Sequence, residues 1–296
     1  MSIPASSASA SRPVLSPAAG RPEPSASASR PVPSPAALSV TELTVRYPGP
    51  AGPVLAVDRV TFTVEPGGAL VLVGESGSGK TTVARTVLGL PGHGAEVTGR
   101  VRLDGTDLRP LDERALSRIR GRRIGYVPQD PTGSLDPLRR IGSQLTEVLL
   151  RHGIATGRRA ARAAVPGLLE RAGIDEPDRI ARSYPHELSG GLRQRAAIAL
   201  AVSCAPGLLV ADEPTTALDA VVRSQILDLF ASLRAVHGIA LLMVTHDLTA
   251  ARRIGGRVAV MRGGRIVESG DAEQVLSRPR HPYAAELVAA GEGGHR

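Results

Sequence analysis

One stretch of the sequence reads Gly74-Glu75-Ser76-Gly77-Ser78-Gly79-Lys80-Thr81. Its spacing, G-x-x-x-x-G-K-[ST], is that of a phosphate-binding loop, in which glycines let successive backbone N–H groups turn toward a polyphosphate. The hydroxyl of Thr81 suits Mg²⁺, and Lys80 can reach the β- and γ-phosphates of a nucleotide. The sequence therefore predicts that this chain binds ATP or GTP.

Lys80 is the only lysine of the chain, although lysine and arginine together number 36. Arginine carries a planar fork on a bulky head, whereas lysine is a compact point charge on a flexible stem and fits between two phosphates. An arginine-rich sequence that has lysine at this one position supports the phosphate-binding interpretation.

Periodic apolar patterns surround the loop. The alternation of apolar and polar residues from Leu38 predicts a strand, and residues 60–64 predict another. The apolar run 69–73 follows a Pro66-Gly67-Gly68 turn and leads directly into the phosphate-binding loop. Residues 81–90 predict a helix whose N-terminal dipole faces the bound phosphates. The stretch from about 131 to 187 is arginine-rich and helix-patterned, which predicts a helical subdomain inserted in an α/β core.

Two buried strands predicted in the second half each end in polar residues. Residues 208–211 precede Asp212 and Glu213, and residues 240–245 precede His246. Side chains at the carboxyl ends of parallel strands line the ligand crevice, so Asp212 is expected to hold Mg²⁺ through water and Glu213 to orient the attacking water. A helix capped by Gly238 is predicted between these strands, and one of its faces is lined by Val222, Ile226, Leu229, Leu233 and Val236.

A second anion-binding helix start is predicted in the run Leu188-Ser189-Gly190-Gly191-Leu192-Arg193-Gln194, with the helix over residues 192–203. One phosphate cannot use two such cradles of the same chain. We therefore expect a head-to-tail dimer in which Ser189 and Gly191 of one subunit close over the nucleotide held by Lys80 of the other.

With these motifs in this order, the sequence resembles the ATP-binding subunits of ABC transporters from about residue 38 to residue 287, and residues 188–194 match the signature of that family. The resemblance implies an α/β fold: a P-loop NTPase core of the ABC ATPase type, with an antiparallel β subdomain and an inserted helical subdomain. It also implies that ATP and Mg²⁺ are bound and that ATP is hydrolysed.

The resemblance further assigns roles to single residues. Tyr47 would stack on adenine, Gln129 would touch the metal and relay its state toward membrane subunits, and His246 would contact the γ-phosphate. The implied catalytic residues are Glu213, His246 and Gln129, and the implied metal-binding residues are Thr81, Gln129 and Asp212. The implied nucleotide-binding residues are Tyr47, Gly74, Ser76, Gly77, Ser78, Gly79, Lys80, Thr81, Thr82, Ser189, Gly190, Gly191, Gln194 and Asp219, the last of which would lie at the dimer interface.

A narrower resemblance lies in several short sequence motifs, which are similar to those of the subunits that power import of oligopeptides, dipeptides or nickel. These motifs are Gln129-Asp130-Pro131, Ser134-Leu135-Asp136-Pro137, Tyr184-Pro185-His186-Glu187, residues 212–219, and His281-Pro282-Tyr283. Many peptide-importing members carry a longer C-terminal extension with a cysteine cluster. This sequence stops soon after Tyr283 without one, which favours nickel or metal chelates, or an untyped branch, and leaves peptides as an alternative.

The resemblance implies several partners at the cytoplasmic face of the cell membrane, where the chain would be peripheral. These are two membrane permease subunits, a second ATP-binding subunit that is either the same chain or a related one, and indirectly a solute-binding protein. Nucleic acid is not expected, because the arginines behind the net charge of +8 are scattered and aromatic residues make up only 2% of the chain.

Two other classes of function compete with this interpretation. A soluble ABC-type ATPase acting on nucleic acid or ribosomes is the main alternative, but repair and chromosome members have long coiled coils between the phosphate loop and the signature, and translation members usually carry two cassettes. Neither feature is present in the sequence. A nucleotide-binding switch without a transport role is disfavoured by the combination of Ser189-Gly190-Gly191 with Glu213.

The remaining segments bound the domain. Residues 1–37 are rich in Ser, Ala and Pro and predict a disordered tail, residues 38–290 the ABC ATPase domain, and residues 291–296 a C-terminal tail. Cys204 is the only cysteine, so no intramolecular disulfide is expected and a reducing cytosol suits the chain. The longest apolar run, residues 196–211, is interrupted by Ser203, Pro206 and Gly207, so no membrane span is expected.

Overall fold

The structure is a computed structural model that describes residues 36–293 of the 296-residue chain. The predicted tail therefore lies outside the described residues except for residues 36 and 37, of which Ala37 is buried. Within the described part, no helix is both long enough and apolar enough to pass through a membrane.

A six-stranded sheet forms the centre of the fold, in the order β10-β9-β3-β8-β7-β6. Its strands pair in parallel except for β10, which is antiparallel to β9. The strands are β3 (Ala69–Val73), β6 (Ile124–Val127), β7 (Leu208–Asp212), β8 (Ala240–Thr245), β9 (Arg257–Arg262) and β10 (Arg265–Asp271). Strands β3, β7 and β8 are buried along their whole length, because both faces of the sheet are covered.

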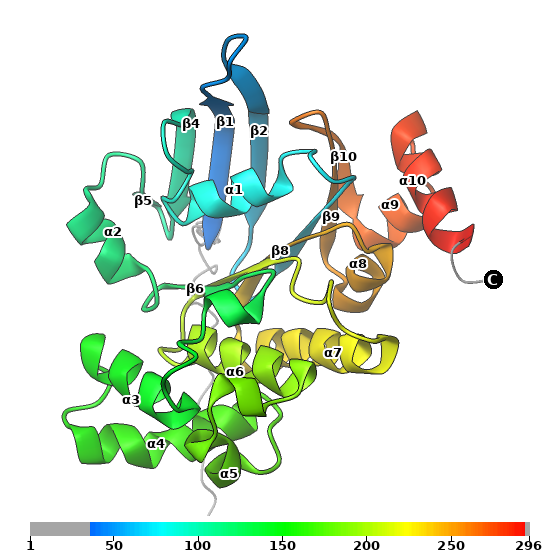
Figure 1. The fold of residues 1–296 in the computed structure, drawn as a ribbon. Coiled ribbons are helices and arrows are strands. Elements are labelled where there is room, and N and C mark those ends of the chain that lie inside the picture. Colours follow the sequence, from blue (N-terminus) through cyan, green and yellow to red (C-terminus); the bar gives the residue numbers. More distant parts are fainter. Residues whose placement is uncertain (1–35, 294–296) are drawn as a thin grey trace, which may run out of the picture. The chain divides into compact units, whose positions relative to one another are not determined.

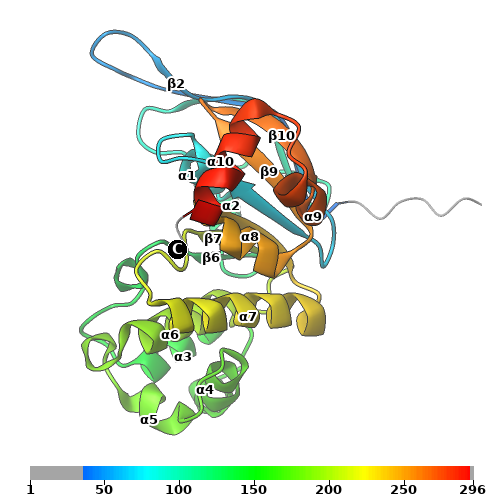
Figure 2. The same ribbon diagram turned by 90° about the vertical axis from the view of Figure 1, so that its right-hand side faces the viewer.

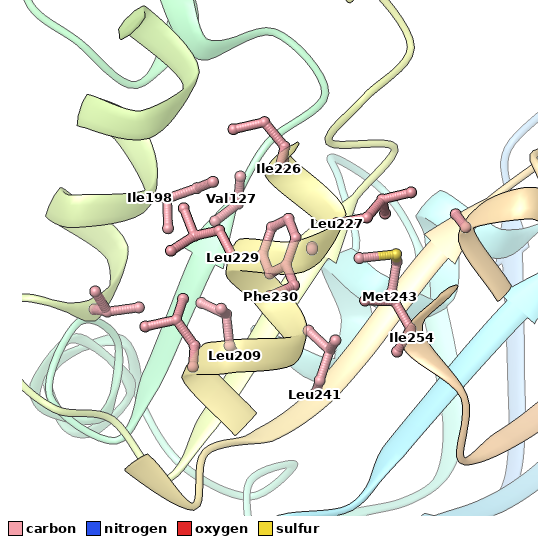
Figure 3. Packing of buried hydrophobic residues seen from close by; sticks show 14 of the residues in the cluster. Val127, Ile198, Leu209, Ile226, Leu227, Leu229, Phe230, Leu241, Met243 and Ile254 are labelled. Carbon is pink, nitrogen blue, oxygen red and sulfur yellow. The ribbon is translucent and has the colours of Figure 1, made fainter. Parts of the chain in front are cut away.

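The alternating side chains of these strands divide the core between the two faces. Val71 of β3 belongs to the cluster that packs with the helices on one face, whereas Leu72 belongs to the cluster on the other face, with α1 and the antiparallel sheet. Figure 3 shows Phe230 of α7 in the middle of the first cluster, near Leu241 and Met243 of strand β8. The helices of the core are α1 (Lys80–Val87), α6 (Gly190–Val202), α7 (Ala220–His237), α8 (Leu248–Ile254), α9 (Ala272–Ser277) and α10 (Pro282–Gly293).

A second, antiparallel sheet has the strand order β2-β1-β4-β5. The register of β1 aligns Leu38 with Val64 on one side and with Leu103 on the other. The sheet consists of β1 (Leu38–Tyr47), β2 (Val54–Val64), β4 (Glu96–Leu103) and β5 (Thr106–Asp107), followed by α2 (Glu113–Ile119). It is drawn in blue and teal in Figure 1, and its inner face shares a hydrophobic cluster with α1.

Three helices occupy the chain between β6 and α6 and are drawn together in green in Figure 1. They are α3 (Ile141–Arg151), α4 (Arg158–Arg171) and α5 (Pro177–Arg182), flanked by the short 3-10 turns Pro131–Gly133 and Pro185–Glu187. Leu145, Leu168 and Ile180, one from each helix, are buried together with residues of α6 in the larger hydrophobic cluster.

Several boundaries differ from the sequence prediction. Helix α1 ends at Val87 rather than residue 90, because Gly89 adopts a positive φ of 68°. Helix α6 begins two residues early, since the Ser189 side chain accepts a hydrogen bond from the N–H of Leu192 and both glycines enter the first turn. Val236, the last residue of the predicted apolar face, is 71% exposed in the last turn of α7. Helix α10 extends three residues into the predicted C-terminal tail.

Candidate functional site

A cavity of about 660 Å³ lies at the carboxyl ends of β3, β7 and β8. It lies where the phosphate loop leaves β3 and where two polar segments follow the neighbouring strands. The position agrees with the general rule that ligands bind beyond the carboxyl ends of strands in open α/β sheets. The lining residues are Ala56, Glu75, Ser76, Gly77, Gly79, Lys80, Thr81, Thr82, Gln129, Glu213, Thr216 and His246.

Glycine is required at both ends of the phosphate loop. Gly74 has φ +155°, and a Cβ there would lie 2.2 Å from the carbonyl oxygen of Met261. Gly79 has φ +101°, and its Cβ would lie 2.4 Å from the carbonyl oxygen of Ala56. Gly79 is also the N-cap residue of α1 and supplies no side-chain cap, so the first N–H groups of that helix are free to bind an anion.

Lys80 is 4% exposed and its ammonium group is held by the loop itself. Its Nζ donates to the carbonyl oxygens of Gly74 and Glu75, at 2.8 Å each, and to Ser78 Oγ at 3.3 Å. Burial lowers the pKa of Lys80, and the negative charges of Glu213, Asp212 and Glu75 oppose that effect. The loop thus holds a compact, partly desolvated cation at the cavity, as a polyphosphate site requires.

Asp212 ends β7 and is 2% exposed. Thr81 Oγ1 donates to its Oδ1 at 3.0 Å, and the Tyr126 hydroxyl donates to its Oδ2 at 3.4 Å. Burial raises the pKa of Asp212, and the hydrogen bond from Thr81 works against the increase. The hydroxyl of Thr81, the carboxylate of Asp212 and the amide oxygen of Gln129 are hard oxygen donors, so this donor set fits Mg²⁺.

Glu213 directly follows and faces the cavity from a strained backbone. Its φ is +45°, in the left-handed region that a glutamate rarely adopts, and its N–H donates to the carbonyl oxygen of Val244 at 2.8 Å. Its Oε2 accepts from Thr216 Oγ1 at 2.8 Å and lies 2.9 Å from His246 Nδ1. The two contacts on Oε2 leave Oε1 available to a water molecule or ligand.

The signature residues lie apart from this cavity within the chain. Ser189 caps α6, and Asp219 caps α7 by accepting from the N–H of Val222 at 2.9 Å. A Cβ on Gly191 would lie 2.7 Å from Cγ1 of Val222, so the first turns of α6 and α7 pack closely. Gln194 is 1% exposed, and its Nε2 has no hydrogen-bond partner among the described residues. None of these residues, nor Gly190, lines the cavity.

Tyr47 does not line the cavity either. Its hydroxyl donates to the carbonyl oxygen of Pro91, and its ring lies beside Gly92. The expected stacking on adenine therefore stays a prediction.

Three residues that support the site were not predicted from the sequence. Tyr126 supports Asp212, Thr216 supports Glu213, and Tyr283 accepts from the N–H of Glu75 in the phosphate loop. The spacing of Thr216, three residues after a glutamate, could have indicated a local hydrogen bond. Tyr126 and Tyr283 are 86 and 208 positions from their partners and leave no local signal.

Comparison with known proteins gives consistent results. The family profile described as ABC transporter matches residues 57–216. The oligopeptide transport ATP-binding protein OppD of Mycobacterium tuberculosis is 44% identical over 253 residues, which cover 86% of this chain and 41% of that protein. The putative peptide import ATP-binding protein BOV_A0348 of Brucella ovis is 47% identical over 245 residues, which cover 80% of this chain and 72% of that protein.

Among solved structures, the dimeric, post-hydrolysis state of the ATP-binding cassette MJ0796 bound to ADP and Pi superposes with a TM-score of 0.71. It is 29% identical, and the match covers 79% of this chain and 98% of that chain. The chain spans only about two fifths of the length of the first curated relatives it matches, the OppD proteins of two mycobacteria.

Proposed function

The chain belongs to the ABC transporter family of ATP-binding proteins, and we propose that it hydrolyses ATP to energise the import of peptides through separate membrane subunits. The observation that carries the proposal is the arrangement of three groups around one cavity. They are the ammonium of Lys80, the hydrogen-bonded pair of Thr81 and Asp212, and the carboxylate of Glu213, which has one oxygen free to orient water. The peptide substrate rests on the descriptions of the relatives OppD and BOV_A0348.

Lys80 and the first N–H groups of α1 bind the phosphates of ATP. Thr81, Asp212 and Gln129 would hold Mg²⁺, which would supply positive charge at the terminal phosphates. Asp212 is kept in place by its hydrogen bonds from Thr81 and Tyr126, so it does not have to reorganise when the nucleotide arrives.

Glu213 orients the attacking water through Oε1, since Oε2 is already occupied by Thr216 and His246. Because a carboxylate accepts, His246 Nδ1 is the donor in their contact, and Nε2 is the ring nitrogen that remains for a γ-phosphate oxygen. Nε2 donates to that oxygen when the imidazole is protonated.

A dimer completes the site. Ser189 and Gly191 open helix α6 but do not line the cavity of their own chain, which supports the head-to-tail arrangement in which they close over the nucleotide of a second subunit. The solved MJ0796 cassette is described as dimeric.

A cavity of about 740 Å³ among α3, α4 and α5 is the proposed contact with the membrane subunits. Its lining includes the side chains of Arg158, Arg162 and Arg182, which make no hydrogen bond or ion pair within the described part of the chain, and only two acidic residues, Glu147 and Asp178. This uncompensated positive charge fits an acidic cytoplasmic segment of a membrane partner.

The test is to solubilise membranes gently, purify the tagged chain, assay ATP hydrolysis and identify the proteins that purify with it. Phosphate release together with multi-span permeases and a solute-binding protein is the expected result, and the ligand of that binding protein decides between peptides and nickel or metal chelates. Ribosomal or DNA-bound partners would overturn the transport proposal. None of the relatives described above is named as acting on nucleic acid.

A further inference from the structure

The motif His281-Pro282-Tyr283 forms the start of helix α10. The carboxylate of Glu268, in β10, accepts from the N–H groups of Arg280 at 3.0 Å and His281 at 2.8 Å. His281 Nδ1 accepts from the N–H of Tyr283 at 3.2 Å. These contacts fix the direction in which the helix leaves the sheet, and α10 then packs on α8 (Figure 2).

Tyr283 points from this helix start toward the phosphate loop. It is 7% exposed, and the guanidinium of Arg262 lies 4.5 Å from the centre of its ring. Its hydroxyl oxygen accepts from the N–H of Glu75 at 3.2 Å. A residue near the end of the sequence therefore contacts the backbone of the nucleotide loop.

The N–H of Glu75 and the carbonyl of Gly74 belong to one peptide unit. A trans peptide is planar, so its N–H and C=O point in opposite directions and rotate together. Tyr283 holds the N–H end, and Lys80 Nζ binds the C=O end at 2.8 Å. Rotation of this one peptide would break both contacts.

The peptide needs an external restraint because it follows Gly74. Glycine has no Cβ to limit its backbone rotation, and its φ of +155° is excluded for other residues here by the contact with Met261. Within residues 36–293, the hydrogen bond that this N–H makes is the one to Tyr283.

We infer that Tyr283 is a positioning residue for Lys80: it fixes the Gly74–Glu75 peptide, whose carbonyl aims the ammonium at the phosphates. The inference rests on the proposed function, since it concerns the same nucleotide site. Tyr283 does not touch the ligand itself. The motif His281-Pro282-Tyr283 places its hydroxyl group at the phosphate loop.

The test uses the full chain with Tyr283→Phe, which keeps the ring, its packing and the contact with Arg262 and removes only the hydroxyl. ATP affinity is measured by calorimetry, KM and kcat by phosphate release, and Tm by thermal unfolding. Loss of one hydrogen bond predicts a roughly threefold to tenfold weaker affinity and higher KM with a nearly unchanged Tm. Tyr184→Phe, at a tyrosine of the helical segment whose ring stacks against His186, is the matched control and should retain the wild-type affinity.

The outcomes separate the inference from the function on which it rests. Wild-type affinity and KM in Tyr283→Phe would overturn the positioning role, as would a lowered Tm with unchanged affinity, which indicates a structural role alone. A wild-type chain that binds ATP but releases no phosphate would count against the proposed function, while the affinities would still decide the role of Tyr283. A wild-type chain that binds no nucleotide would overturn both.

Discussion

The Thr81 hydroxyl donates a hydrogen bond to Asp212 Oδ1 over 3.0 Å, although the two residues are 131 positions apart in the sequence. The contact joins the first turn of α1 to the end of β7. It places the two expected metal-binding groups on rigid elements before any ligand arrives, which is the arrangement that reduces reorganisation during a reaction.

Replacing Lys80 by arginine should lower kcat/KM for ATP by about a hundredfold. The ammonium is buried and fits between the carbonyl oxygens of the loop, whereas a guanidinium is larger and planar. Steady-state phosphate release measures the effect, and Arg118→Lys, at an exposed arginine of α2, is the control for exchanging the two cations. Wild-type activity in Lys80→Arg would show that the site does not require a compact cation.

Glu213→Gln should reduce ATP hydrolysis by about 10²-fold to 10⁴-fold while ATP is still bound. The amide retains the shape of the side chain but does not polarise water as a carboxylate does. Size-exclusion chromatography with ATP is expected to reveal a stable dimer of the variant, because closure is no longer followed by hydrolysis. A variant that hydrolyses ATP at the parental rate would remove Glu213 from its assigned role.

Acidification should destabilise the fold through His152. Burial, together with the charges of Arg151 and Arg122, lowers the pKa of His152 in the folded chain. The unfolded chain then binds more protons, so this stability is present above about pH 6.5 and is lost as the pH falls from there through the folded pKa. The free energy of unfolding, measured by urea between pH 7.5 and 5.5, should fall less steeply in His152→Gln than in the wild type. Parallel curves would contradict the prediction.

The double variant Arg158→Glu with Arg162→Glu should reduce the amount of membrane subunits that purify with the chain. Both side chains line the arginine-rich cavity among α3, α4 and α5, and neither has an ion-pair partner in the structure of residues 36–293. The ATPase activity of the isolated chain should be unchanged. The matched control, Arg114→Glu with Arg118→Glu on exposed positions of α2, should purify with its partners as the wild type does. Equal recovery in both variants would place the contact elsewhere.

Local patterns determined the central elements of the fold. The runs 69–73 and 240–245 form β3 and β8 within the predicted residues, since a continuous apolar run flanked by turns has few alternatives to a buried strand. The apolar periodicity of the sequence was less informative about burial at the ends of helices. Val236 continues the apolar spacing of α7 but is exposed, because helical periodicity does not report where the covering partner ends.

The amino-acid sequence was enough to predict that a phosphate loop, an acidic pair and a histidine follow three strands, because each motif is encoded by neighbouring residues. How these motifs come together depends on the folded chain. His246 and Thr216 both contact Oε2 of Glu213. The hydroxyl of Tyr283 accepts a hydrogen bond from the Gly74–Glu75 peptide, whose carbonyl binds Lys80. These contacts depend on strand order, on the left-handed backbone of Glu213 and on the packing of α10, and such long-range relations arise only when the core closes.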